Sequence, residues 1–596
     1  MKDVEMDYAQ ALEYPYDLKK IFRKKKAIKR VLLPTATKAI KIAFLGGSTT
    51  AEILDILELF LLKNQIRAEF YESDYNRYYE DAVYGNDKLD EFKPDIVYVH
   101  TTGANIQAFP CINQTNAEVD GLIGEELTKF KAIWRGLHHR FSCQIIQNNF
   151  EYNHLRALGA LDTIDYRGKN CYILKLNQEF ARLAEVDDAL HINDIHYLSS
   201  ILGLDEWADR SLWWSSKYAL SFNSIPTLAH NISSIICGIY GRTKKCLTLD
   251  LDNTLWGGVV GDDGPEGIRL GEGDAVAEAY ASFQRYIKLL HSRGVILSVC
   301  SKNDEGRAKE GFGSEGSVLG LNDFAAFYAN WSPKNQNIEN IAKDLNIGGD
   351  SIVFVDDNPV ERALVSKELP QVAIPELGSD VVDYPALIDR NNYFHTLNIT
   401  TDDIQRNESY RDNAKRHQEV EHHQNYDDFL KSLGMSAIIN SFDHANEVRI
   451  AQLINKTNQF NLTGLRVATP QVDEAINNPR YITLYAKLKD KFGDNGLVSV
   501  VMGEIQGQTL QIIVWVMSCR VFKRTLESCV MNVLVQKCLE HDIRIIKGRY
   551  LATAKNEIVS EHYGDMGFAK LEGDVGSSAW ELDVATYRDL DTMINI

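Results

Sequence analysis

Long apolar runs, paired cysteines and an excess of basic residues are all missing from this sequence of 596 residues. No segment reaches the ~18 consecutive apolar residues that a helix needs to span a bilayer. The nine cysteines are odd in number and show no CxxC spacing, so neither a disulfide framework nor a zinc site is expected. Residues 1–5 lack the basic-then-apolar order of a secretory signal. We therefore expect a cytoplasmic protein with reduced thiols and no membrane span.

The charge balance is acidic, with 83 Asp and Glu against 64 Lys and Arg and a formal net charge of -19. This balance argues against a protein that binds nucleic acid. Residues 19–30 run the other way, since they form a basic segment. That segment is either a solvated helix face or a patch for an acidic partner.

Apolar strand-like runs alternate with helical stretches in three blocks, which predicts a multidomain α/β protein. Strands are expected at 41–45, 95–100, 244–249, 295–300, 351–355 and 510–516, and a long helix at 525–540. The polar stretch between the second and third blocks is expected to be a helical connector. The predicted parts are 1–40 (a basic segment), 41–242, 243–395, 396–433 (the connector) and 434–596.

The most informative motif is Asp250-Leu251-Asp252-Asn253-Thr254, directly after a predicted strand. In a parallel sheet, the loops beyond the carboxyl ends of the strands form the active-site crevice. Two carboxylates two residues apart can divide the chemistry, one as a nucleophile and the other as an acid and base. The motif therefore predicts a catalytic loop built on Asp250 and Asp252.

Further polar residues follow the other strands of this block. Ser301 comes after one strand, where its hydroxyl could bind a phosphoryl oxygen, and Lys334 opens a helix, where it could neutralise phosphate charge. Asp356 and Asp357 follow a third strand, where carboxylates could hold Mg²⁺. Mg²⁺ is expected because an anionic nucleophile must approach an anionic phosphate. We expect these groups to meet at one edge of the sheet.

This order of residues resembles the haloacid-dehalogenase (HAD) superfamily over residues 243–395. The resemblance implies that Asp250 is a nucleophile that forms an aspartyl-phosphate and that Asp252 is the general acid and base. It implies that Asp250, the backbone carbonyl of Asp252 and Asp356 bind Mg²⁺, with Asp357 in support, and that Thr254, Ser301 and Lys334 contact phosphate. The intervals of 51 residues from Asp250 to Ser301 and 33 from there to Lys334 leave no room for a full cap domain. An open site that admits a bulky substrate is therefore expected.

The first block resembles SGNH hydrolases through Ser48, in Gly46-Gly47-Ser48-Thr49, and through Gly103 and Asn105. In such enzymes a serine attacks an ester while Gly and Asn donors hold the oxyanion. An Asp-x-x-His pair is also required, and Asp188 with His191 fits by spacing, whereas Asn193 replaces the acid before His196. Two interpretations stay open, a reactive Ser48 and a non-hydrolytic scaffold with this fold.

The third block resembles GNAT acyltransferases in its last part, Tyr563-Gly564-Asp565-Met566-Gly567-Phe568. In those enzymes a Gly-x-Gly/Ala loop after a strand seats the coenzyme pyrophosphate at a helix N-terminus. The corresponding stretch here is 520–525, in which Lys523 and Thr525 replace the glycines. Its cations, Arg520, Lys523 and Arg524, could instead meet phosphopantetheine or a phosphorylated acyl group. Cys519 is either an acyl-thioester site, with Arg520 beside it, or a buried cysteine at a strand end.

Three longer motifs, together with the extended form of the first, make the whole chain resemble the FkbH-like family, HAD subfamily IIIC. They are Asp250–Gly258, Asn455–Leu462, Phe492–Leu497 and Ser518–Val521. The resemblance implies a Mg²⁺-dependent phosphatase that removes phosphate from a small phosphorylated substrate. It also implies transfer of a glyceryl-type acyl group from 1,3-bisphosphoglycerate to the phosphopantetheine of an acyl carrier protein.

Two other functions remain compatible with the residues. One is a stand-alone phosphatase of a small phosphorylated metabolite, and the other is a transferase in surface glycan or lipid biosynthesis. The sequence leaves open the substrate, the reactivity of Ser48 and Cys519, coenzyme A binding by the third block, and the oligomeric state.

Overall fold

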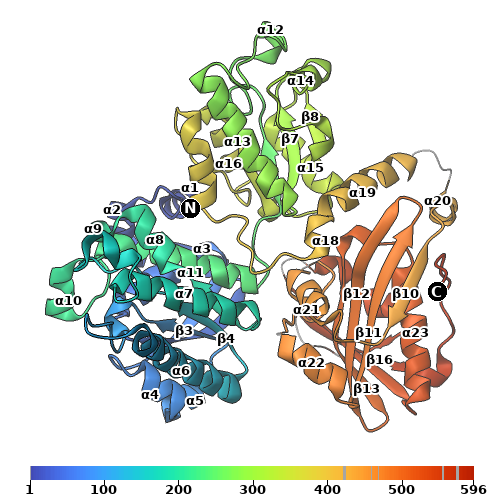
Figure 1. The fold of residues 1–596 in the computed structure, drawn as a ribbon. Coiled ribbons are helices and arrows are strands. Elements are labelled where there is room, and N and C mark those ends of the chain that lie inside the picture. Colours follow the sequence, from blue (N-terminus) through green and yellow to red (C-terminus); the bar gives the residue numbers. More distant parts are fainter. Residues whose placement is uncertain are drawn as a thin grey trace. The chain divides into compact units, whose positions relative to one another are not determined.

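A computed structural model describes residues 2–420, 425–457, 459–467, 469–553, 556–571, 573 and 576–596. The chain forms two compact units, Met1–Cys237 and Gly238–Ile596 (Figure 1). The first contains one sheet and the second contains two. No helix in the described part of the chain is long and apolar enough to cross a bilayer. The predicted multidomain α/β class is confirmed.

The first unit is built on a five-stranded parallel sheet with the order β2-β1-β3-β4-β5. Its strands are β1 (Lys38–Gly46), β2 (Ile66–Glu72), β3 (Ile96–His100), β4 (Gln144–Asn148) and β5 (Leu190–Asn193). The covering helices are α3 (Ala51–Lys63), α4 (Tyr78–Val83), α5 (Asp87–Phe92), α6 (Asn116–Phe141), α7 (Lys169–Glu185), α8 (Ile195–Leu202) and α11 (Ile225–Ile239). The strand order reverses between β1 and β3, where ligands commonly bind in this architecture.

The basic run lies on α2 (Leu18–Leu32), which follows α1 (Lys2–Ala11). Lys25 pairs with Glu52 at 2.8 Å and with Asp55 at 3.0 Å, both on α3. Lys29 pairs with Glu58 of the same helix at 2.6 Å. Part of the positive charge of α2 is thus balanced inside the unit, because its lysines lie beside acidic side chains of α3.

The second sheet is parallel, with the order β8-β7-β6-β9. Its strands are β6 (Cys246–Leu249), β7 (Ile296–Ser301), β8 (Phe324–Ala329) and β9 (Ile352–Val355). Its helices are α12 (Val260–Asp263), α13 (Ala275–Ser292), α14 (Glu305–Gly311), α15 (Lys334–Asp344), α16 (Pro359–Glu368) and α17 (Tyr384–Arg390). All of the residues of β6, β7 and β9 are buried, as expected for strands that are covered on both faces.

The third sheet has seven strands, in the order β10-β11-β12-β13-β14-β16-β15. They are β10 (Ser436–Asn440), β11 (Tyr481–Asp490), β12 (Gly493–Gln506), β13 (Thr509–Met517), β14 (Ile545–Leu551), β15 (Ala569–Lys570) and β16 (Ser577–Asp583). Helices α21 (Glu447–Lys456), α22 (Thr469–Asn477), α23 (Leu526–Glu540) and α24 (His562–Asp565) accompany them. Neighbouring strands are antiparallel except β13 and β14, which are parallel and joined through α23. This is the GNAT-like α+β arrangement expected from the sequence.

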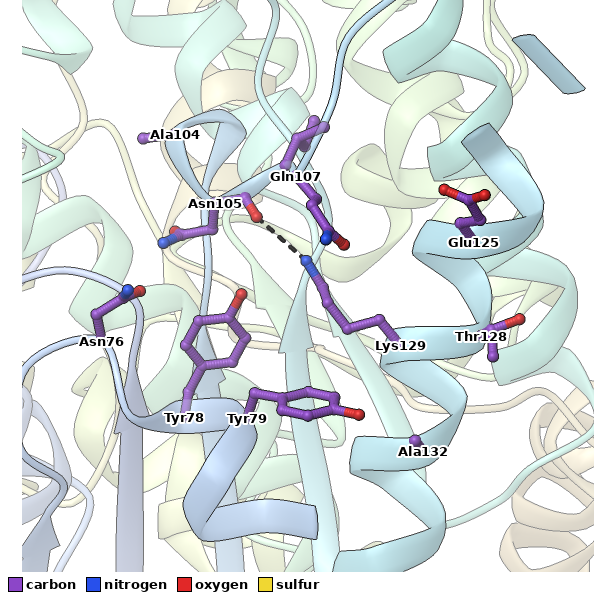
Figure 2. Close-up of a pocket in the computed structure, with 11 residues that line it drawn as sticks. Asn76, Tyr78, Tyr79, Ala104, Asn105, Gln107, Glu125, Thr128, Lys129 and Ala132 are labelled. Carbon is purple, nitrogen blue, oxygen red and sulfur yellow. Dashed lines mark hydrogen bonds between the residues drawn. The ribbon is translucent and has the colours of Figure 1, made fainter. Parts of the chain in front are cut away.

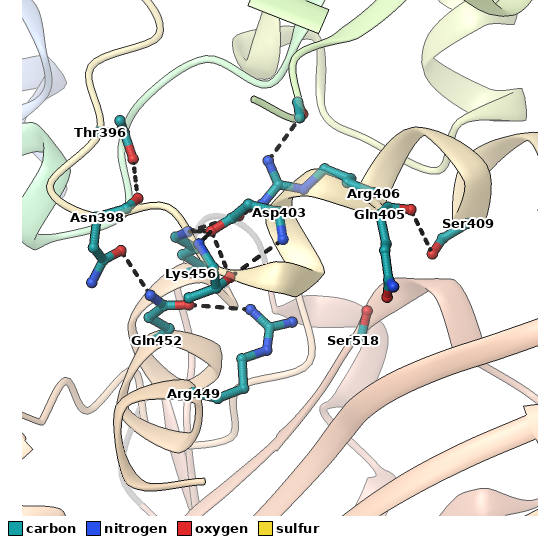
Figure 3. A network of polar contacts seen from close by, with 12 residues as sticks. Thr396, Asn398, Asp403, Gln405, Arg406, Ser409, Arg449, Gln452, Lys456 and Ser518 are labelled. Atoms are coloured by element: carbon teal, nitrogen blue, oxygen red, sulfur yellow. Dashed lines mark hydrogen bonds and ion pairs between the residues drawn. The ribbon is translucent and has the colours of Figure 1, made fainter. Parts of the chain in front are cut away.

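The described part of the segment between these two sheets contains α18 (Thr401–Ile404), α19 (Arg406–Val420) and α20 (Tyr426–Ser432). Its anchor is the buried Asp403, which pairs with Arg406 and, at 3.2 Å, with Lys456 of α21 (Figure 3). Arg406 also donates to the carbonyl of Gly294, in the turn that leads into β7. The connector therefore bonds to elements of both sheets.

Candidate active site

Asp250 lies directly after β6, with its backbone N–H bonded to the carbonyl of Val355. The turn that follows is sharp, since Asn253 adopts a left-handed φ of 55°, which asparagine tolerates better than most residues. Thr254 accepts a 3.1 Å hydrogen bond from the backbone N–H of Asp357. This bond ties the loop after β6 to the loop after β9.

Lys334 brings these two loops into one charged cluster. Its ammonium lies 3.0 Å from Oδ2 of Asp250 and 2.6 Å from Oδ2 of Asp356, and all three side chains are buried. Burial alone would lower the pKa of Lys334, but the two carboxylates outweigh it and raise that pKa. The lysine is therefore a permanent cation beside the carboxylate of Asp250.

Burial and the neighbouring Asp250 charge raise the pKa of Asp356 to about 6. Burial, with the same charge, also raises the pKa of Asp357. Three carboxylates thus surround one ammonium in this cluster, and burial adds to the cost of keeping all of them charged.

Three of these carboxylates are placed to share a cation. Oxygens of Asp250, Asp356 and Asp357 lie within 4.8 Å of one another. Oδ1 of Asp250 is buried and has no hydrogen-bond partner in the described part of the chain, which leaves a lone pair for a ligand. Mg²⁺ prefers carboxylate oxygens, often one or two with bound water and phosphate. The residues present fit Mg²⁺.

The side chain of Asp252 is not part of that cluster. Its Oδ1 accepts hydrogen bonds from Nε1 of Trp256 at 2.9 Å and from the backbone N–H of Val260 at 3.0 Å. Its Oδ2 accepts a 2.9 Å bond from the amide of Asn303. Burial raises the pKa of Asp252. The structure thus separates the two aspartates of the motif into different environments.

Asn303 was not singled out in the sequence, and Trp256 was named only as part of the motif Asp250–Gly258. Asn303 comes two residues after Ser301 on the loop that leaves β7, and its position there was the only signal for it. Ser301 itself is buried at the end of β7.

The interval that would hold a lid contains little beyond the core of the domain. Residues 257–330, all of them described, form α12, α13, β7, α14, a short 3-10 helix (Leu321–Asp323) and β8, with loops at 264–274 and 312–320. A single bridge pairs Gly257 with Arg269 in the loop around α12. No separate cap domain is built from this interval.

The SGNH-like residues gather near the end of β1, and two of their polar groups, from Gly103 and Asn105, are bonded within the chain. Asn105 donates to the carbonyl of Gly47 at 2.8 Å, and the N–H of Gly103 faces the carboxylate of Glu151 at 3.2 Å. The Ser48 hydroxyl is buried and has no hydrogen-bond partner within the described ranges. The groups proposed to hold an oxyanion are therefore already occupied.

The candidate histidines do not hydrogen-bond Ser48. Nε2 of His191 lies 2.6 Å from Oε1 of Gln144, and Nδ1 of His196 lies 3.2 Å from the carbonyl of Phe150. Asn193 is buried and donates to Asn148 at 2.7 Å. This geometry favours the scaffold interpretation of the first unit.

The loop that carries Asn105 borders a cavity of about 640 Å³ in the first unit (Figure 2). Its lining mixes polar and apolar side chains, and Lys129 lies at its wall, bonded to the carbonyl of Asn105 at 3.2 Å and paired with Glu126. Tyr78 and Gln107 also face the space.

In the third block, the basic side chains of residues 520–525 make contacts with different partners. Arg520 bonds to the hydroxyl of Ser518 at 3.2 Å, whereas Arg524 is buried and paired with Asp490 at 3.2 Å. Arg524 is therefore not available to a ligand, contrary to our expectation. The side chain of Cys519 lies outside the described residues.

Comparison with known proteins agrees with this layout. Residues 41–237 match the family model described as FkbH, N-terminal domain. The crystal structure of the N-terminal part of the protein BF1531 from Bacteroides fragilis, containing a phosphatase domain complexed with Mg, is 31% identical with a TM-score of 0.58. The match covers 64% of this chain and all (100%) of that one. No curated protein matches the sequence.

Two acetyltransferases align with about a quarter of the chain. The ribosomal-protein-S18-alanine N-acetyltransferase from Escherichia coli is 8% identical, with a TM-score of 0.21, and covers 26% of this chain and 97% of its own. The GNAT domain of S. lividans PAT is 12% identical, with a TM-score of 0.21, and covers 25% and 90%. Likenesses this distant do not bear on activity.

Proposed function

Because the chain belongs to the FkbH-like family of HAD proteins, we propose that it is a Mg²⁺-dependent phosphatase working through an aspartyl-phosphate. One observation carries the proposal, the placement of the Lys334 ammonium between the carboxylates of Asp250 and Asp356. A phosphoryl group that approaches Asp250 would meet this fixed positive charge. The phosphatase domain of BF1531, crystallised with Mg, supports the same reading.

In the proposed reaction, a carboxylate oxygen of Asp250 attacks phosphorus and the bond to the leaving oxygen breaks. Asp252 gives that oxygen its proton, which its raised pKa favours. Water then attacks the phosphorus of the phosphorylated Asp250 while Asp252 takes the proton. Phosphate leaves, and the carboxylate of Asp250 is restored.

Lys334 and Ser301 hold the phosphoryl oxygens in this proposal, and Thr254 fixes the loop that presents them. Asp250, Asp356 and Asp357 would hold Mg²⁺, with the backbone carbonyl of Asp252. When bound, Mg²⁺ neutralises phosphate charge so that an anionic nucleophile can approach.

The first test is phosphate release from p-nitrophenyl phosphate and from 1,3-bisphosphoglycerate. We expect Asp250→Asn to lose at least about a thousandfold in rate, because no other carboxylate is placed as the nucleophile. Asp262→Asn, an exposed change on α12, is the matched control. Full activity in the Asp250 variant would refute the mechanism.

We further propose that phosphate removal is coupled to acyl transfer onto an acyl carrier protein in the cytoplasm. Family membership and the GNAT-like third sheet support this coupling. Holo-carrier protein incubated with the enzyme and 1,3-bisphosphoglycerate should gain the mass of a glyceryl group. Free phosphate without a mass change would instead favour a stand-alone phosphatase.

A further inference from the structure

The sheet of the third block opens between two parallel strands. β13 and β14 pair only through Thr509–Gln511 and Ile545–Lys547, and they diverge beyond these residues. In a GNAT-like domain the pyrophosphate seat follows the first of these strands, so the arm of a coenzyme A would run along the end of β13. An extended ligand would use the backbone groups exposed at this opening.

In this chain those backbone groups are taken by residues 460–462. Phe460 accepts from the N–H of Met517 at 3.1 Å, and Leu462 donates to the carbonyl of Trp515 at 3.4 Å. On the other side, the N–H of Leu551 donates to the carbonyl of Leu462 at 2.8 Å. The segment thus bonds to both diverging strands.

The segment is held by its own polar network. Asn461 is 1% exposed, and its Oδ1 accepts from the N–H of Gly464 at 2.9 Å. Asn556 donates to the carbonyl of Asn461 at 2.9 Å. Before it, Lys456 is anchored on Asp403 of the connector (Figure 3). Because the segment is fixed at both ends, it is an integral part of the fold.

The pyrophosphate seat is occupied as well. Lys523 and Thr525 have left-handed φ angles of 60° and 61°, so the loop keeps the backbone shape that glycines would give. The N–H of Lys523 is directed at the carboxylate of Glu527, 3.3 Å away, in the first turn of α23. A carboxylate at this position takes the place of an external anion.

We propose that the third block is closed to acyl-CoA, with Glu527 as the internal anion and residues 460–462 in the course of the arm. The domain then takes its acyl group from a donor without a nucleotide diphosphate, and the phosphopantetheine of a carrier protein reaches the domain by a path other than this opening. The statement about the acyl donor rests on the proposed acyl transfer, whereas the closure of the coenzyme A path does not, because it is a property of the fold.

The test measures the binding of coenzyme A to the full-length protein by titration calorimetry. We expect no saturable binding with a Kd below about 0.1 mM. Tighter binding that inorganic pyrophosphate displaces would overturn the proposal. Hydrogen exchange gives a second reading, since the amides of Met517 and Leu551 should exchange slowly without ligand. Fast exchange at both would show that the opening is not filled.

Variants at Glu527 test its part separately. We expect E527A to bind inorganic pyrophosphate at least about tenfold more tightly than the wild type, because the N–H of Lys523 becomes available. E527Q keeps the size of the side chain but removes its charge, and its affinity for inorganic pyrophosphate should change in the same direction. E540A, at the exposed far end of α23, is the control. Equal affinity of all four proteins would remove Glu527 from this role, and none of these readouts depends on phosphate release.

Discussion

The side-chain amide of Asn303 donates a 2.9 Å hydrogen bond to Oδ2 of Asp252. The orientation of that amide is set, because its oxygen accepts from the backbone N–H of Asp304 at 3.0 Å. Asn303 therefore holds the carboxylate of Asp252 away from the cluster around Lys334. Two aspartates that are two residues apart acquire different roles through such contacts.

Replacing Asn303 with alanine should lower kcat for phosphate release about tenfold, with little change in KM, because the proposed acid loses its orientation. Steady-state kinetics on p-nitrophenyl phosphate measure both constants. Gln336→Ala, an exposed change on α15, is the control. A variant with unchanged kcat would show that Asp252 needs no such support.

Replacing Lys334 with methionine should destabilise the second unit by roughly 3–5 kcal/mol in EDTA, because the buried Asp250 and Asp356 lose their counter-charge. Urea unfolding gives the free energy. We expect Mg²⁺ to recover more stability in this variant than in the wild type. Glu339→Gln, exposed on the same helix, should change neither value. An equal response to Mg²⁺ in both proteins would contradict the shared cluster.

Removing divalent ions with EDTA should abolish phosphate release, and added Mg²⁺ should restore it. At a hundredfold excess over Kd, Mg²⁺ should stabilise the folded protein by about 2.7 kcal/mol, which calorimetry reports as a higher Tm. Asp356→Asn should need much more Mg²⁺ for the same shift. An identical Mg²⁺ titration in that variant would exclude Asp356 as a ligand.

Replacing Ser48 with alanine should leave the hydrolysis of p-nitrophenyl acetate and the release of phosphate unchanged. The reason is that the Gly103 N–H and the Asn105 amide are already bonded within the chain. A loss of ester hydrolysis in the variant, at wild-type Tm, would instead establish a reactive serine.

Glu151 should make the first unit less stable as the pH rises. Burial raises its pKa to about 7 from an ordinary value of 4.5, so the folded state binds its proton more tightly than the unfolded state. Stability should fall between about pH 4.5 and pH 7, by up to about 3 kcal/mol. Glu151→Gln should flatten this dependence in urea unfolding followed at several pH values. A wild type and variant with parallel curves would contradict it.

The strands were predictable because apolar periodicity is a local feature of the sequence, and the residues of the central site were predictable because each lies at the end of such a strand or opens a helix. Contacts made across the fold were not. Glu151 reaches Gly103 over 48 positions, and Arg524 reaches Asp490 over 34. Neither pairing leaves a spacing that could be recognised, so the occupied oxyanion groups and the sequestered arginine appeared only in three dimensions.

The lack of a cap within residues 257–330 has a consequence for the lifetime of the proposed phosphorylated intermediate. Under the proposed mechanism, the phosphorylated Asp250 would be shielded from water by its own buried site and by the molecule that lies over it, and not by a lid from this interval. The substrate that delivers the phosphate would then also set how fast water reaches the phosphorylated Asp250, and so how long that intermediate lasts.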